Sequence, residues 1–167
     1  MDVLNELGIL LHVFISVILC GIIGFERERG NKPAGIRTNM IVGGAVTLVV
    51  MLGEIILFRY ETLGLGEFIN ADPTRIIHAV IIGVSFIGAG TVLQIREEQK
   101  IKYLTTAATI LFSTGIGIAV GLQQYILAVG VTLLIVFINS IVVYIDRKLE
   151  ERRKKKELKK KNKAGSR

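Results

Sequence analysis

The chain has 167 residues, of which 51% are hydrophobic, and a formal net charge of +7 at pH 7. Its single cysteine, Cys20, excludes a framework of disulfide bonds within the chain, and we expect it to be a small buried side chain. The 18 glycines and two prolines are typical of closely packed helices and not of a disordered or fibrous chain.

Five apolar stretches follow one another, each close to the ~20 residues that a helix needs to cross a bilayer. They are Leu7–Phe25, Thr38–Phe58, Ile76–Ile95, Leu104–Leu122 and Tyr125–Ile145. They lack the polar stripe of a soluble helix. The sequence therefore predicts an all-α membrane protein: a five-helix transmembrane bundle in residues 1–145, with its first helix retained, and a basic tail in residues 146–167.

The basic residues predict an orientation. If the stretches alternate in direction, loop 26–37 carries four of the 21 lysines and arginines, loop 96–103 three and the tail twelve, all on one side, while the other side carries two. The positive-inside rule then places the N-terminus outside and the C-terminus in the cytoplasm. The tail has no aromatic residue to stack on a base, so we expect it to lie near anionic lipid and not to bind nucleic acid.

Charges of alternating sign follow the first stretch, at Glu26, Arg27, Glu28, Arg29, Lys32 and Arg37. They form either a solvated network at the inner interface or a mixed network that gates a path. Later in the chain, Thr105 and Thr106 enter the fourth stretch, where they either cap that helix or line a polar seam.

Acidic residues gather on the predicted outer side. Glu54 lies near the outer end of the second stretch, and Asp72 precedes the third, with Arg75 close behind. Asp72 is expected to cap a helix that begins at Pro73, but it also belongs to an acidic surface with oxygen ligands of the kind that Mg²⁺ accepts. Asp72 is therefore the candidate metal ligand. Further acidic residues of this surface are Asp2, Glu6, Glu61 and Glu67.

Two histidines lie within the apolar stretches, His12 in the first and His78 in the third, either as hydrogen-bonded packing residues or as ligands and proton relays. The sequence contains no HExxH, GxSxG or Walker motif, so we expect no enzymatic activity and no cofactor other than Mg²⁺ as substrate or ligand.

Small residues predict where helices approach closely, because helix association in lipid depends on backbone contact. The second, third and fourth stretches are expected to form the tight centre of the bundle. The packing glycines of the third and fourth are Gly83, Gly88, Gly90, Gly115, Gly117 and Gly121.

Five motifs follow one another along the chain: GFERERGNKPAGIRTN from Gly24, DPTRI from Asp72, FIGAG from Phe86, LTTAAT from Leu104 and GIGIAVG from Gly115. In this order they resemble the MgtC/SapB family of bacterial inner-membrane proteins. The resemblance implies a five-helix domain in the cytoplasmic membrane of a bacterium, linked to growth at low Mg²⁺ and in some members to virulence. Longer members carry a soluble C-terminal domain, which we expect to be absent here.

The family's polar motif positions fall on one set of residues in this chain: Glu26, Arg27, Glu28, Lys32, Arg37, Thr38, Asn39, Asp72, Arg75, Thr105 and Thr106. Three positions depart from the usual pattern. Ala79 stands where relatives commonly have glutamine, Tyr103 where they have glycine, and Leu111 where they have an aromatic residue. Loss of the glutamine amide weakens the case for an ion path through the third helix.

Two functions remain open from the sequence. The first is transport of a divalent cation, with Asp72 and Glu54 receiving the ion outside and Glu26 or Glu28 releasing it inside, in a homo-oligomer that supplies ligands from several copies. The second is a regulator without a transport path, which packs its glycine-rich faces against another membrane complex such as ATP synthase or a transporter.

Overall fold

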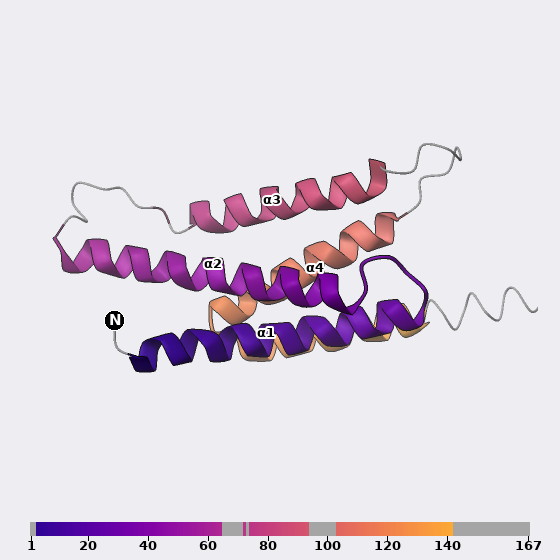
Figure 1. Cartoon of the computed structure of the whole chain (residues 1–167), viewed down its shortest axis with the longest axis horizontal. Helices are drawn as coiled ribbons and strands as arrows, with labels where there is room; N and C mark the ends of the chain where they lie inside the picture. Colours follow the sequence, from indigo (N-terminus) through magenta and orange to yellow (C-terminus); the bar gives the residue numbers. More distant parts are fainter. Residues whose placement is uncertain (1–2, 65–71, 73, 94–102, 142–167) are drawn as a thin grey trace, which may run out of the picture.

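The computed structural model describes residues 3–64, 72, 74–93 and 103–141. The labelled helices are α1 (Val3–Arg29), α2 (Ile36–Thr62), α3 (Thr74–Leu93) and α4 (Leu104–Gly121), and a fifth helix follows at Tyr125–Ile141 (Figure 1). Each of α1 to α4 is long and apolar enough to cross a membrane. The predicted all-α bundle of five helices is confirmed, and the described residues contain no strand.

The helices alternate in direction, so their ends gather at two ends of the bundle (Figure 1). The Asn5 end holds the start of α1, the end of α2, the start of α3 and the turn between α4 and the fifth helix. The Arg27 end holds the end of α1, the start of α2, the end of α3 and the start of α4. The predicted tail lies outside the described residues, as do Asp2 and Glu67.

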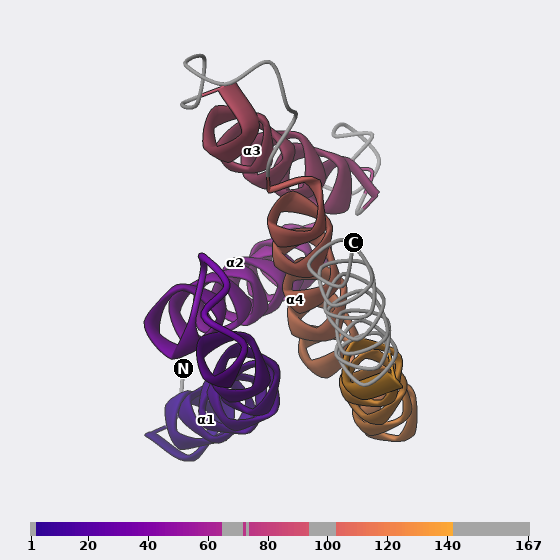
Figure 2. The same ribbon diagram turned by 90° about the vertical axis from the view of Figure 1, so that its right-hand side faces the viewer.

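Helix α4 occupies the centre of the bundle (Figure 2). One buried apolar cluster joins α1, α4 and the fifth helix through Cys20, Ile116 and Ala128. A second joins α2, α3 and α4 through Val46, Val84 and Ile110. Of the 18 most apolar consecutive residues of α4, 56% are buried, against 11% of the corresponding residues of α3. We expected the second, third and fourth stretches to form the centre of the bundle. This prediction is wrong for the third stretch, because α1 and not α3 packs at the centre with α2 and α4.

Glycines permit the closest helix contacts at the centre. A Cβ atom built on Gly117 would lie 2.7 Å from the carbonyl oxygen of Gly43, and one on Gly24 would lie 2.8 Å from the carbonyl oxygen of Gly35. Gly121 lies against Val50. These contacts leave no room for a side chain, so α2 approaches both α1 and α4 along the backbone.

The other predicted packing glycines divide into two kinds. A Cβ on Gly88 would lie 3.4 Å from that of Ala107, an ordinary contact between α3 and α4. In the part of the chain that the structure describes, Gly83, Gly90 and Gly115 have open space at the same position. Those three glycines therefore do not mediate contacts within the described bundle.

Two connections begin with the same helix-ending turn. After α1, the amides of Asn31 and Lys32 donate to the carbonyl oxygens of Glu28 and Arg27, and Asn31 has a positive φ of 51°. After α4, the amides of Gln123 and Gln124 bond back in the same way, and φ of Gln123 is 60°. Both turns are Schellman motifs, in which the left-handed residue is commonly glycine.

Candidate functional site

Arg27 is buried at the end of α1, with 3% of its surface exposed. Its Nη2 atom donates to the hydroxyl of Thr106 on α4 at 2.6 Å and to the carbonyl oxygen of Pro33 at 3.2 Å. Both acceptors are uncharged, and its buried Nε atom has no hydrogen-bond partner in the described structure. Through these two hydrogen bonds the guanidinium connects the α1–α2 loop to the start of α4. Burying a charged group among uncharged partners carries a desolvation cost.

Asn39 is fully buried near the start of α2 and faces the same loop. Its Nδ2 atom donates to the carbonyl oxygens of Ala34 at 2.7 Å and Gly35 at 2.9 Å, and its Oδ1 atom accepts from the hydroxyl of Ser113 at 2.7 Å. The backbone of Ala34 is left-handed, with φ of 54°. The side chain of Asn39 therefore fixes the end of the loop and bonds α2 to α4.

The two glutamates beside Arg27 also act as hydrogen-bond acceptors. Glu26 accepts from Nδ2 of Asn139 on the fifth helix at 2.8 Å, and Glu28 accepts from the backbone amide of Ile36 at 3.2 Å. Glu28 thereby supplies a cap to the first turn of α2, where backbone amides have no partner within the helix. We name the combined set the Arg27 cluster: Glu26, Arg27, Glu28, Asn39, Thr106, Ser113 and Asn139.

The remaining predicted residues of this end lie around the Arg27 cluster. Thr106 is buried, whereas Thr105 is exposed and accepts through its carbonyl oxygen from the hydroxyl of Thr109. Lys32 and Arg37 are exposed, and Thr38 is half-buried. The structure therefore joins Glu26, Arg27, Glu28, Asn39 and Thr106 of the predicted set, whereas Lys32, Arg37, Thr38 and Thr105 lie outside the cluster.

Sequence reasoning missed Ser113 and Asn139, which complete the Arg27 cluster. Thr106, Ser113 and Gly117 are spaced by seven and four residues, so a helical periodicity in the small and polar residues of the fourth stretch marks this face of α4. Asn139 is a carboxamide within an otherwise apolar stretch. A pattern in the sequence marks each of these two residues, but neither pattern identifies the residue to which it is hydrogen-bonded.

The Asn5 end holds the predicted outer residues, which the structure keeps apart from the Arg27 cluster. Asp72 is exposed, and its Oδ1 atom accepts from the amide of Thr74 at 2.9 Å and from the Thr74 hydroxyl at 2.6 Å. These two bonds, followed by the nearby charges of Arg75 and His78, hold the pKa of Asp72 below its usual value. Asp72 thus caps the start of α3, as expected.

The other polar residues of this end surround an open cavity or lie at the surface. Glu54 lines a cavity of about 760 Å³. His12 forms a hydrogen bond through Nε2 to the Tyr125 hydroxyl, which links α1 to the fifth helix, while Arg75 and His78 are exposed. Among the residues that the structure describes, no three His, Cys, Asp or Glu side chains are grouped as a metal ion requires.

The bundle and the Arg27 cluster together define a multi-pass helical membrane protein with a polar network joining four helices at one end. A family model described as "MgtC family" matches residues 13–148. The chain belongs to the MgtC family, which confirms the resemblance inferred from its motifs.

Several curated relatives are similar over most of the chain. "Putative magnesium transporter YhiD" of Escherichia coli is 33% identical over 72% of this chain and 54% of its own length. "Protein MgtC" of Brucella abortus is 32% identical over 76% and 48%, and "Protein SapB" of Bacillus subtilis 30% over 84% and 59%. The chain thus spans about half of each relative's length. No solved structure matches.

Proposed function

We propose that this protein takes part in Mg²⁺ homeostasis in the bacterial cytoplasmic membrane as a regulator that contacts another membrane protein, and that it does not conduct the ion itself. Family membership and the name of the Escherichia coli relative support the link to Mg²⁺. The geometry of the Arg27 cluster favours regulation over conduction.

The observation that carries this proposal is the use of Glu26 and Glu28. In the transport hypothesis Glu26 or Glu28 releases the ion at the Arg27 end, whereas in the structure each of these carboxylates accepts a hydrogen bond that holds a helix in place. The buried guanidinium of Arg27 lies next to them in sequence and repels a divalent cation. Carboxylates used in this way stabilise a fixed surface, and a fixed surface suits recognition of a partner.

The partner class follows from the membrane location. We expect a larger membrane complex, such as ATP synthase or a transporter, to pack against the helix surfaces that this bundle leaves exposed. Helix α3 offers the most exposed surface, with Ile82 70% and Phe86 82% exposed. Packing of helices in lipid needs close contact of small residues, and the open positions at Gly83 and Gly90 permit it.

Transport of Mg²⁺ is the second candidate, favoured by the open cavity beside Glu54 at the predicted outer end. In this reading a homo-oligomer supplies the oxygen ligands that a single copy lacks. Asp72, at the same end of the bundle, is the metal ligand in this alternative.

Flux measurements on purified protein in liposomes separate the two candidates. With a Mg²⁺-sensitive dye inside the vesicles, we expect the same Mg²⁺ uptake with and without protein, and we expect cross-linking in intact cells to join α3 to a defined membrane complex. A protein-dependent uptake that Asp72→Asn removes and Glu61→Gln leaves intact would overturn the regulatory proposal and support transport. Glu61 is a matched control because it is an exposed carboxylate of the same acidic surface that is not a metal ligand in the transport alternative.

A further inference from the structure

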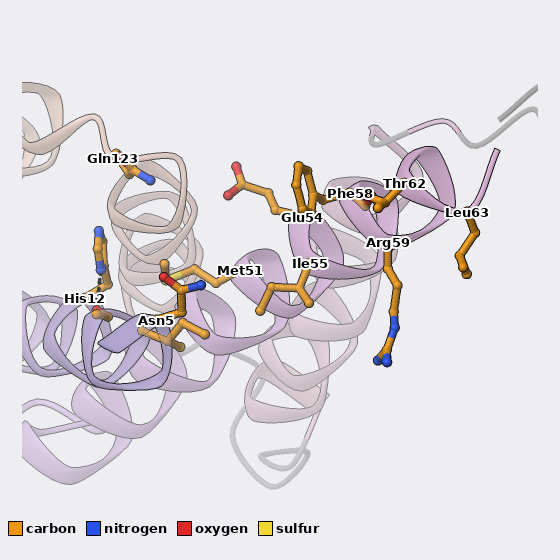
Figure 3. Close-up of a pocket in the computed structure, with 12 residues that line it drawn as sticks. Asn5, His12, Met51, Glu54, Ile55, Phe58, Arg59, Thr62, Leu63 and Gln123 are labelled. Atoms are coloured by element: carbon orange, nitrogen blue, oxygen red, sulfur yellow. Dashed lines mark hydrogen bonds between the residues drawn. The ribbon is translucent and has the colours of Figure 1, made fainter. Parts of the chain in front are cut away.

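The cavity at the Asn5 end lies between the start of α1, the second half of α2 and the turn at Gln123 (Figure 3). Its volume of about 760 Å³ falls in the range of cavities that hold small organic molecules. The regulatory function proposed above does not use this cavity, and the transport alternative uses its carboxylate but gives no role to its apolar lining. It therefore calls for a separate explanation.

One wall of the cavity is apolar. Met51, Ile55 and Phe58 are spaced by four and three residues, so they form one stripe along α2. Ile9 of α1 lies in the lining as well. A hydrocarbon chain laid along this stripe is removed from water at one end of the bundle, which is favourable in proportion to the apolar area covered.

Among the described residues that line the cavity, Glu54 is the one with a carboxylate side chain. In Figure 3 its side chain extends over the cavity between Phe58 and the Gln123 turn, with the Phe58 ring one helical turn further along. A carboxylate beside an aromatic ring attracts an organic ammonium group through charge and through the cation–π interaction.

The other titratable groups around Glu54 do not occupy its carboxylate. Arg59 lines the cavity but is five residues further along α2, roughly 140° around the helix, and its side chain points away from Glu54 (Figure 3). His12 has both ring nitrogens in use, with Nδ1 2.6 Å from the carbonyl oxygen of Gly8 and Nε2 bonded to Tyr125. Among the residues that the structure describes, no titratable group of the lining therefore occupies the Glu54 carboxylate, and it is open to a ligand.

We propose that this cavity binds an amphiphilic organic monocation, with its ammonium group on the Glu54 carboxylate and its alkyl chain along the Met51–Ile55–Phe58 stripe. A lone carboxylate balances a single positive charge, whereas Mg²⁺ takes six ligands, most of them water or charged oxygen, and gains nothing from an apolar wall. The amides of Asn5 and Gln123 at the rim supply further polar contacts. The ammonium group comes from a free alkylamine or from the headgroup of phosphatidylethanolamine.

Binding of hexylammonium to the purified full chain in dodecyl maltoside micelles tests the proposal, measured by calorimetry with empty micelles subtracted. We expect hexylammonium to bind about tenfold more tightly than hexanol, because the alcohol has the same chain and no charge. Glu54→Gln is expected to remove this tenfold preference while hexanol binding stays unchanged. Phe58→Leu is expected to weaken hexylammonium binding about threefold.

Glu61→Gln is the control, because Glu61 is an exposed carboxylate on the same helix outside the cavity lining. Equal affinities for hexylammonium and hexanol, or equal losses in Glu54→Gln and Glu61→Gln, would overturn the proposal. Added phosphatidylethanolamine that competes with hexylammonium supports the lipid headgroup as the source of the ammonium group. A tenfold preference that this lipid does not reduce supports a free amine.

Discussion

Asn39 makes more of the contacts between elements than any other side chain of the Arg27 cluster. It uses both hydrogens of its amide on loop carbonyls and its oxygen on Ser113, so one buried residue joins the α1–α2 loop, α2 and α4. Buried polar groups of this kind contribute little while satisfied but are costly when a partner is removed. Asn39 is therefore the residue at which the stability of the cluster is best tested.

Substitution Asn39→Ala is expected to destabilise the protein by about 2–4 kcal/mol, because it leaves the Ala34 carbonyl and the Ser113 hydroxyl without the Asn39 side chain and opens a small cavity. The midpoint of unfolding by sodium dodecyl sulfate, followed by circular dichroism in mixed micelles, measures the loss. Asn5→Ala is the control, since Asn5 is exposed and should cost less than about 0.5 kcal/mol. Equal midpoints for the two variants would show that the Asn39 contacts do not stabilise the fold.

Asp72 gives the start of α3 a dependence on pH. Its bonds to Thr74 favour the charged carboxylate and lower its pKa, so the contribution is fully present above the ordinary pKa of an unfolded aspartate. It is lost as the pH falls through the lowered value of the folded state. We expect the Thr74 amide resonance to titrate with a midpoint below the ordinary ~3.9.

Asp72→Asn supplies the matched comparison, because asparagine keeps an oxygen that accepts from Thr74 but has no charge to lose. The Thr74 amide of that variant should not shift over the same range of pH. A wild-type midpoint at or above the ordinary aspartate value would contradict the cap described at the start of α3.

The turn between α4 and the fifth helix depends on a residue in a left-handed conformation. Gln123 has φ of 60° at the position where the Schellman motif favours glycine, so its Cβ atom is strained there. Gln123→Gly is expected to stabilise the protein by about 0.5–1 kcal/mol, as glycine adopts this conformation without steric cost. The same unfolding measurement in mixed micelles detects the gain.

Gln124→Gly distinguishes relief of strain from a general effect of glycine. Gln124 follows in the same turn but has no positive φ, so glycine there only adds freedom to the unfolded chain. We expect that variant to be no more stable than the wild type. Stabilisation by Gln124→Gly and not by Gln123→Gly would exclude the strain.

The positions of the helices were predictable from the sequence, whereas the contacts between helices were not. An apolar run of about 20 residues predicts a membrane helix because its backbone must be satisfied internally, and this requirement is local. Contacts such as Arg27 to Thr106 or Asn39 to Ser113 join residues more than 70 positions apart, and the pattern of one segment does not identify its partner.

Tyr103 shows the same limit at a departure from the family pattern. In the comparison with the family pattern, Tyr103 stands where relatives commonly have glycine. In the structure it has a left-handed backbone conformation just before α4, with φ of 73°. The departure was visible in the sequence, but its conformational consequence depends on the loop geometry. For the candidate site, the sequence named the residues of α1 that the structure places in the Arg27 cluster, but it did not identify the residues that they contact.

Parallel packing of α1 and the fifth helix links the two ends of the molecule. His12 meets Tyr125 at the Asn5 end and Glu26 meets Asn139 at the Arg27 end, so both helices run in the same direction over equal spans of sequence. An odd number of alternating helices places the start of α1 and the end of the fifth helix at opposite ends of the bundle. A bundle of this kind that spans a bilayer has its two chain ends in different compartments.

The distribution of basic residues then selects one of the two orientations. The connection at residues 26–37 lies at the Arg27 end, where the described part of the fifth helix also ends, at Ile141. That connection and the sequence beyond residue 145 carry 16 of the 21 basic residues, so the positive-inside rule predicts that the Arg27 end faces the cytoplasm. We expect a reporter active only outside the cytoplasm to give signal when fused before Met1, and a fluorescent protein that folds only in the cytoplasm to give signal when fused after Arg167. Replacing the lysines at 154–156, 159–161 and 163 with glutamine, as a group, should leave this result unchanged, because the α1–α2 and α3–α4 loops still carry seven basic residues against two on the opposite side. Signals from one compartment for both fusions would contradict the alternation of the five helices, and the reverse pair of signals would place the cavity beside Glu54 in the cytoplasmic half of the membrane.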